Sequence, residues 1–138
     1  MIFVDSNVII DVLDRDPIWY DWSLSQMIAA AALGSVVTNH VVMAEAAPHY
    51  GSLPEFIAQL DEMTIEIELL NDKAAYAAGT AFLEYRRRST KRQSVLPDFL
   101  IGGHASALKA SILTRDARVY RTYFPTVPLI TPPKDQND

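Results

Sequence analysis

Residues 1–10 have the sequence MIFVDSNVII, and this stretch indicates how the rest of the chain folds. Its apolar start, with β-branched and aromatic side chains, is typical of a short buried strand. The strand pattern ends at Asp5-Ser6-Asn7, three residue types that commonly cap helices. The apolar residues within 8–13 then predict a short helix. A strand followed directly by a helix is the repeating unit of parallel sheets.

The same alternation continues along the chain. Short apolar segments predict four further strands at residues 35–38, 64–70, 111–114 and 127–130. Capping residues and helical periodicity predict helices at residues 19–33, 40–47, 53–63, 72–88, 97–109 and 116–123. We therefore expect an α/β fold, a five-stranded parallel sheet with helices on both faces. In such sheets ligands bind beyond the carboxyl ends of the strands.

Two details of the helices predict how they pack. In the helix at 72–88 the apolar residues Ala75, Tyr76, Gly79, Phe82 and Leu83 fall on one face, which we expect to be buried. The adjacent glycines at 102 and 103 each weaken a helix relative to alanine. They therefore predict that the helix at 97–109 packs very closely on a neighbour, within the chain or across a dimer interface.

Length and composition narrow the class of protein. The 138 residues suit one domain, which we place at residues 1–131, followed by a Pro-rich polar tail at 132–138 that we expect to be flexible. A content of 49% hydrophobic residues excludes intrinsic disorder of the domain. The absence of cysteine excludes disulfides, thiolate zinc sites and cysteine nucleophiles. With no leader pattern and no apolar run long enough to span a membrane, we expect a cytoplasmic protein.

Four acidic residues fall where such a fold places a site. Asp5 and Asp116 follow predicted strands, Asp98 lies in the first turn of a helix, and Glu45 lies in an apolar helix. Each has an ordinary explanation on its own, because acids cap helices and interact favourably with their N-terminal dipole. Glu45 could also lie on a narrow exposed stripe.

Taken together, the four acids predict a metal site. Two carboxylates about 5 Å apart repel by about 3 kcal/mol at an effective dielectric constant of 20, and a divalent cation would offset this repulsion. Oxygen ligands without cysteine favour a hard ion, Mg²⁺ or else Mn²⁺. The polar residues Ser6, Asn7 and Thr114 lie beside the acids in the sequence and could support them.

Four motifs carry a resemblance to a known family. They are VDSNVI at 4–9, VMAE at 42–45, LPDFLIGGHA at 96–105 and LTRD at 113–116. In their order and spacing they resemble PIN-domain proteins, and specifically VapC-type toxin ribonucleases of bacterial toxin–antitoxin pairs. The resemblance covers nearly the whole chain and implies a PIN-like three-layer sandwich. It also implies Mg²⁺-dependent hydrolysis of RNA, with Asp5, Glu45, Asp98 and Asp116 as the metal-binding and catalytic residues.

The resemblance also implies partners. Proteins of this kind form homodimers and bind a cognate antitoxin across the active site. Basic side chains near the acids and at the end of the helix at 72–88 could contact RNA phosphates. These candidates are Arg86, Arg87, Arg88, Lys91, Arg92, Arg115 and Arg118. The alternative for the cluster at 86–92 is a solvated helix end, where cations are favourable. The three histidines lack metal-site spacing and are expected to be structural.

Other functions fit the sequence less well. A haloacid-dehalogenase-type phosphatase needs a second aspartate two residues after the first, where this chain has Asn7. A receiver domain would need paired acids beside Asp5 and a lysine after its last strand, whereas Lys134 lies in the tail. The remaining alternative is a non-catalytic nucleic-acid-binding PIN protein that acts as a regulator with its antitoxin. Failure of the four acids to bind metal would favour it.

Overall fold

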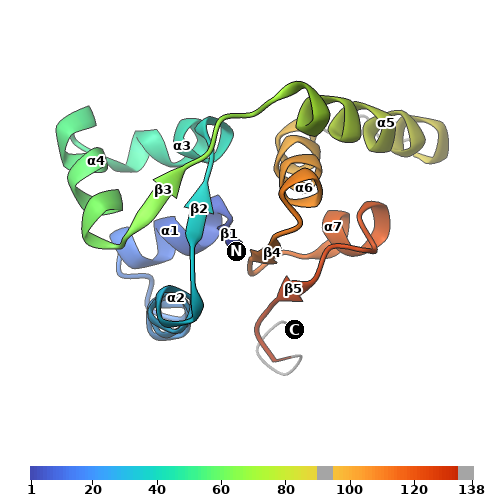
Figure 1. Ribbon diagram of the computed structural model, residues 1–138. Helices are drawn as coiled ribbons and strands as arrows, with labels where there is room; N and C mark the ends of the chain where they lie inside the picture. Colours follow the sequence, from blue (N-terminus) through green and yellow to red (C-terminus); the bar gives the residue numbers. More distant parts are fainter. Residues whose placement is uncertain (90–94, 134–138) are drawn as a thin grey trace.

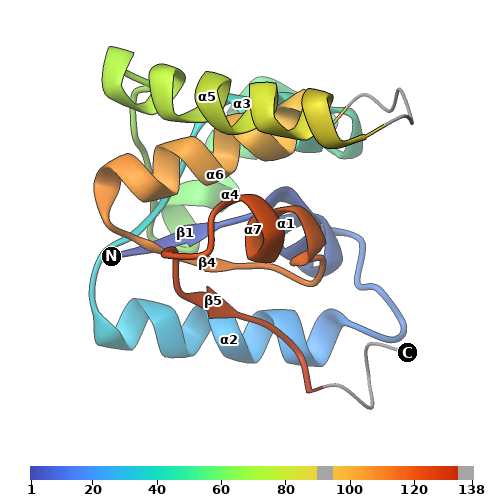
Figure 2. The ribbon, with the colours of Figure 1, turned by 90° about the vertical axis from the view of Figure 1, so that its right-hand side faces the viewer.

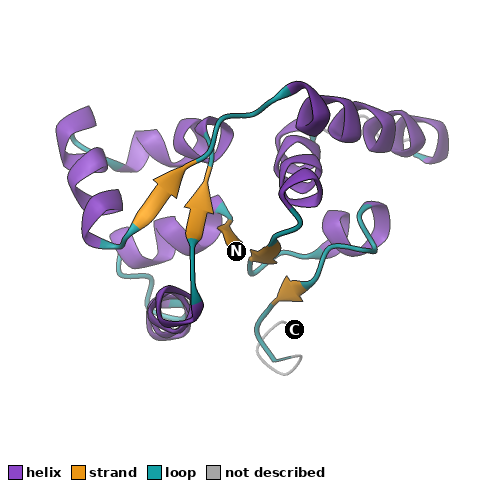
Figure 3. Ribbon diagram, viewed as in Figure 1, coloured by secondary structure: helices purple, strands orange, loops and turns teal. Residues whose placement is uncertain are grey.

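The computed structural model describes residues 1–89 and 95–133 of the chain, and Figures 1 and 3 show its helices and strands. Five parallel strands form one sheet: β1 (Ile2–Val4), β2 (Val36–Thr38), β3 (Ile65–Ile67), β4 (Ser111–Leu113) and β5 (Leu129–Ile130). Their order across the sheet is β3-β2-β1-β4-β5. The predicted five-stranded parallel sheet is therefore confirmed.

Seven α-helices occur in the described part of the chain. They are α1 (Ser6–Leu13), α2 (Tyr20–Leu33), α3 (His40–Ala46), α4 (Leu53–Glu62), α5 (Asp72–Arg88), α6 (Leu96–Leu108) and α7 (Arg118–Tyr123). Figure 2 shows α5 and α6 on one side of β1, β4 and β5, and α2 on the other. The predicted α/β sandwich, with helices on both faces of the sheet, is thus confirmed.

Strand order makes β1 and β4 the topological switch point of the sheet. The chain passes from β1 to β2 on one side, yet β1 also pairs with β4, with Phe3 opposite Val37 and Ile112. Connections therefore leave the carboxyl ends of β1 and β4 in opposite directions. Such a switch point is where ligands bind in open parallel sheets. The strands here are fully buried, with Phe3, Val4 and Leu113 at 0% exposure, so the polar residues that follow them start from a rigid base.

Helix α6 packs very closely on α5, as the adjacent glycines predict. A Cβ atom on Gly103 would lie 2.5 Å from the backbone nitrogen of Ala78, so only glycine fits there. The buried side chains of α5 are Ala74 and Ala78. The face predicted for this helix is therefore wrong in phase, since Tyr76 is 76% exposed. Close contact between the two backbones, rather than side-chain size, decides which face of α5 turns inward.

Several element ends differ slightly from the predictions. Helix α3 ends at Ala46 and continues as the 3₁₀ turn η1 (Ala47–His49), because Pro48 has no backbone N–H to donate. Helix α7 begins at Arg118 and leaves Asp116 in the preceding loop. In the described residues no helix is long and apolar enough to cross a membrane. The predicted tail at 132–138 falls mostly outside the described residues, as do Lys91 and Arg92.

Candidate active site

Asp5 lies at the centre of the candidate site, directly after β1. As the N-cap of α1, it accepts a hydrogen bond at Oδ1 from the backbone N–H of Ser6, at 2.8 Å. Its Oδ2 accepts from the Thr114 hydroxyl at 2.8 Å and from the Tyr120 hydroxyl at 2.9 Å. The residue is only 4% exposed. Burial raises the pKa of Asp5, and the hydrogen bonds from Thr114, Tyr120 and Ser6 oppose that rise.

A polar network ties the loop after β4 to the start of α1. The Asn7 side-chain amide donates to the Thr114 hydroxyl at 3.1 Å, and Asn7 Oδ1 accepts from the backbone N–H of Arg115 at 3.0 Å. Thr114 Oγ1 also accepts from the backbone N–H of Asp116 at 3.1 Å. The predicted supporting residues Asn7 and Thr114 therefore join the segments that carry Asp5 and Asp116.

Glu45 and Asp98 approach Asp5 from two other helices, α3 and α6. The Ser6 hydroxyl donates to Glu45 Oε1 at 3.2 Å, and this serine thereby bridges Glu45 and Asp5. Glu45 is exposed on α3, as the alternative of an exposed stripe predicted, yet partial desolvation and the charge of Asp5 still raise its pKa. The pKa of Asp98 is raised to about 6 by burial and by the charges of Asp5, Glu45 and Asp116. The four acids are thus close enough to act on one another electrostatically.

Asp116 differs from the other three acids because it has an ion-pair partner, Arg118. Arg118 donates from Nε to Oδ1 at 3.0 Å and from Nη2 to Oδ2 at 2.9 Å, which forms a two-pronged ion pair at the rim of the site. This hydrogen-bonded pair lowers the pKa of Asp116. Across residues 1–89 and 95–133, no three His, Cys, Asp or Glu side chains stand close enough to hold one metal ion together.

The donor chemistry of the site nevertheless fits a hard divalent cation. All four side chains are carboxylates, the ligand type that Mg²⁺ and Mn²⁺ prefer. Desolvation and the charges of neighbouring acids raise the pKa of Asp98 and of Glu45 more than Arg118 and Ser6 lower them, so a cation bound there would be favourable. For Asp116 to join the other acids on one ion, Arg118 must first release its carboxylate.

Tyr120 and Asp11 are two site residues that sequence analysis missed. Tyr120 on α7 is 1% exposed and reaches Asp5 across 115 positions. In the sequence, only its position four residues after Asp116 could have indicated a role in the site, and an aromatic residue there is equally typical of core packing. Asp11 is 2% exposed and accepts from Arg115 Nε at 2.6 Å and Nη2 at 2.8 Å. The Ser23 hydroxyl donates to the same carboxylate at 2.7 Å.

Some of the predicted RNA-binding arginines are held by other side chains of the protein, and others are exposed. Arg115 is held by Asp11 and lies over the Trp19 ring, 5.1 Å from its centroid, which favours a structural role in place of phosphate binding. Arg118 holds Asp116 and is 87% exposed. Arg88 lies over the Tyr123 ring, whereas Arg86 and Arg87 are exposed in the last turn of α5. Lys91 and Arg92 lie outside the described residues.

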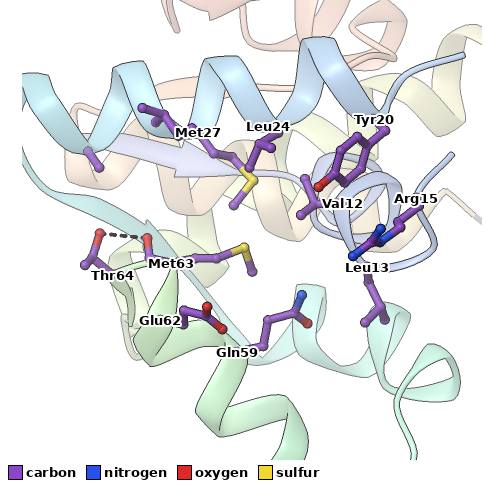
Figure 4. Close-up of a pocket in the computed structure, with 12 residues that line it drawn as sticks. Val12, Leu13, Arg15, Tyr20, Leu24, Met27, Gln59, Glu62, Met63 and Thr64 are labelled. Carbon is purple, nitrogen blue, oxygen red and sulfur yellow. Dashed lines mark hydrogen bonds between the residues drawn. The ribbon is translucent and has the colours of Figure 1, made fainter. Parts of the chain in front are cut away.

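A cavity of about 620 Å³ lies between α1, α2 and α4, away from the acids (Figure 4). Apolar side chains such as Val12, Met27 and Met63 line most of it, with Tyr20 and Gln59 among the polar ones. Its size alone would suggest a ligand site. None of the four acids lines it, however, so the cavity offers no cluster of groups for hydrolytic chemistry. Asp5 and its acidic neighbours, and not this cavity, therefore form the candidate active site.

Comparisons with known proteins agree with the fold. The PIN domain family model matches residues 2–125. VapBC2 from Rickettsia felis, bound to a DNA fragment from its promoter, has a chain with TM-score 0.74 and 19% identity over 96% of this chain and 100% of that one. VapBC-1 from nontypeable Haemophilus influenzae gives 0.68 and 16%, over 95% and 98%. Mycobacterium tuberculosis VapC20, a sarcin–ricin loop cleaving toxin, gives 0.62 and 14%, over 88% and 95%. No curated protein matches the sequence.

Proposed function

The chain belongs to the PIN domain family, and from this premise we propose that it is a metal-dependent endoribonuclease, the toxin of a bacterial toxin–antitoxin pair. One observation carries the proposal. Asp5, Glu45 and Asp98 come from three separate elements, β1–α1, α3 and α6, and are near enough at the switch point of the sheet for the charges of Asp5 and Glu45 to raise the pKa of Asp98. A fold that needed these acids only as helix caps would have no reason to bring their charges together.

The four acids would hold Mg²⁺, or Mn²⁺, and each has a distinct setting. Asp5 is fixed by buried donors, Glu45 by Ser6, and Asp98 by its place in the first turn of α6. Asp116 would complete the set after Arg118 releases it. A bound divalent ion supplies an acidified water and stabilises the charge that develops on the phosphate.

The remaining residues of the site position the substrate and the acids. Asn7 and Thr114 hold the loop that carries Asp116, and Arg115 anchors the same loop to α1 through Asp11. Arg118 stands exposed at the rim. Released from Asp116, its guanidinium could contact an RNA phosphate, which is bidentate chemistry suited to arginine.

The proposed partners are an RNA substrate, a cognate antitoxin and a second copy of the chain. The shared fold with VapC20, a toxin described as cleaving the sarcin–ricin loop, supports an RNA substrate. Large apolar side chains lie exposed at the start of α5 and just before it, with Leu69 at 74% and Tyr76 at 76% exposure. A homodimer would cover them. We expect this pair to act in the cytoplasm, where RNA substrates occur.

One observation favours the alternative, a non-catalytic nucleic-acid-binding regulator that acts with its antitoxin. In the described part of the chain the acids are not assembled around a single point, and Arg118 neutralises Asp116. If that ion pair persisted when metal is added, the site would lack its fourth ligand. DNA bound to the VapBC2 structure is consistent with such a role.

The test compares RNA cleavage and metal binding in matched variants. Purified, antitoxin-free protein is incubated with structured RNA in Mg²⁺, Mn²⁺ or EDTA, beside Asp5→Asn and Asp98→Asn. Asp72→Asn is the control, because Asp72 is also a first-turn acid but lies on α5. We expect cleavage in metal that falls to the EDTA level in both site variants and persists in the control. Calorimetry that finds no metal bound to the wild type would refute the proposal and favour the regulator, whereas metal binding without cleavage would mean that the RNAs tried do not include the substrate.

A further inference from the structure

We propose that Tyr120 is a positioning residue that, with Thr114, locks the orientation of Asp5 so that Oδ1 alone is left to bind the metal ion. The inference rests on the proposed metal-dependent function and deepens it. It assigns a role to a residue that none of the family motifs in the sequence contains.

The contacts around Asp5 are divided unequally between its two oxygens. Oδ2 receives two hydroxyl donors, Thr114 at 2.8 Å and Tyr120 at 2.9 Å. Oδ1 receives one close donor, the backbone N–H of Ser6 at 2.8 Å. The Ser6 hydroxyl lies 3.5 Å from Oδ1 but 3.2 Å from Glu45 Oε1, so it is directed mainly toward Glu45.

The number of lone pairs on each oxygen of Asp5 predicts which oxygen can bind the metal ion. Each carboxylate oxygen can accept about two strong interactions. Oδ2 already has two, both from buried side chains, and has no capacity left for a metal ion. Oδ1 has one strong donor and one free position, on the side shared with Ser6 and Glu45. Asp5 would therefore bind the metal through one oxygen only.

The Tyr120 hydroxyl cannot easily turn away from Asp5. The residue is 1% exposed, and a buried hydroxyl without its partner would be costly. A tyrosine phenol is protonated at physiological pH and can donate one hydrogen bond, which here goes to Asp5 Oδ2. An ionised Asp5 can only accept, so the direction of this hydrogen bond is fixed.

The functional reason for such a lock lies in the crowding of the acids. Without the second donor from Tyr120, only the Thr114 hydroxyl would hold Oδ2, and the carboxylate could rotate more freely about its Cβ–Cγ bond. The metal ion would then have to order Asp5 as well as gather Glu45 and Asp98. Partners that orient metal ligands in this way typically change metal affinity by about 10–100-fold when they are removed.

The test removes one oxygen atom. Tyr120→Phe deletes the donor and keeps the ring, and Tyr123→Phe is the matched control on the same helix. Tyr123 packs against Tyr85 and Phe99, and its hydroxyl makes no hydrogen bond among the described residues. Mn²⁺ binding is measured by calorimetry, which separates the dissociation constant from the folded fraction. We expect Tyr120→Phe to weaken Mn²⁺ binding about tenfold or more, and Tyr123→Phe to change it less than twofold.

Thr114→Val gives an independent variant should Tyr120→Phe fold poorly, since it removes the other donor to Oδ2. Thr114→Ser keeps a hydroxyl at that position and should restore most of the affinity. An unchanged dissociation constant in Tyr120→Phe, with or without a lower binding stoichiometry, would overturn the inference and leave the proposed function standing. An equal loss in Tyr123→Phe would overturn it too. No Mn²⁺ binding by the wild type would refute the function and this inference together.

Discussion

Asp98→Asn is expected to stabilise the metal-free protein at neutral pH while abolishing its response to metal. Asp98 lies in the first turn of α6, and its pKa is raised from 3.8 to about 6 by burial and by the charges of Asp5, Glu45 and Asp116. Its ionised form is therefore less favourable in the folded chain than in the unfolded one. Asparagine has nearly the same shape and carries no charge.

The size and the pH range of the effect follow from this shift. A rise of about two pKa units corresponds to about 3 kcal/mol, at 1.36 kcal/mol per unit. Asp98 is only partly buried, so solvent screening reduces this to about 1–2 kcal/mol. Asp98→Asn also loses the favourable interaction of the carboxylate with the α6 dipole, which lowers the expected gain in stability by about 0.3–1 kcal/mol. The net gain expected for Asp98→Asn at pH 7.5 is about 1 kcal/mol.

The sign of the stability change depends on the pH at which Asp98 ionises in the folded chain and in the unfolded chain. Below pH 3.8 the Asp98 carboxyl is protonated in both states, and its charge costs nothing. As the pH rises from 3.8 to about 6, the unfolded chain loses the proton while the folded chain keeps it, and stability falls. Above pH 6 the full cost is present. The advantage of Asp98→Asn should therefore be complete at pH 7.5 and vanish near pH 4.

Urea unfolding in EDTA at pH 7.5 and pH 4 measures this difference. Asp72→Asn is the control, since it removes a first-turn acid from α5 and should bring no gain at either pH. Added Mn²⁺ should stabilise the wild type and leave Asp98→Asn unchanged. The reasoning would be refuted by an Asp98→Asn variant that is less stable than the wild type at pH 7.5 in EDTA, or by a gain of equal size at pH 4.

Two further predictions concern the rim of the site and the packing beneath it. Arg118→Gln should strengthen Mn²⁺ binding up to about fivefold, because an exposed ion pair with Asp116 is worth at most about 1 kcal/mol. Calorimetry tests this, with Arg121→Gln as the control. Equal gains in both variants would mean that the change in net charge alone is responsible. Gly103→Ala should cost about 3 kcal/mol in urea unfolding, because its Cβ would meet the backbone of α5. Gly79→Ala, with open space around the same atom, should instead gain about 0.5–1 kcal/mol, and a mild effect at both positions would contradict the close contact.

The fold could be predicted because its signals are local. The first two strands are short, buried and followed by the capping residues Asp5 and Asn39, and both side chains cap their helices in the structure. The carboxyl ends of parallel strands meet at one edge, so strand ends alone place Asp5 and the loop of Asp116 near each other. Glu45 and Asp98 approach from α3 and α6, whose positions depend on crossovers, and the family motifs were needed to group them with the others.

What escaped prediction depends on contacts between distant residues. The inward face of α5 is set by the approach of Gly103 to Ala74 and Ala78, a backbone contact that hydrophobic periodicity does not detect. The pairing of Arg115 with Asp11 joins residues 104 positions apart. The sequence predicts a phosphate contact for Arg115, and only the structure shows that this side chain has an ion-pair partner within the protein.

The distribution of partners among the four acids itself argues for a cation. Asp5 has hydrogen-bond donors on both oxygens, Glu45 has Ser6, and Asp116 has Arg118. In the described part of the chain no donor reaches the carboxylate of Asp98, and its pKa is raised to about 6 although the charge of Arg118 opposes the rise. A structural ion-pair network would supply the missing positive charge from a side chain, because an uncompensated acid lowers stability. A fold that retains this deficit at the switch point of its sheet leaves a position for positive charge from outside, as a site built to bind a divalent ion would.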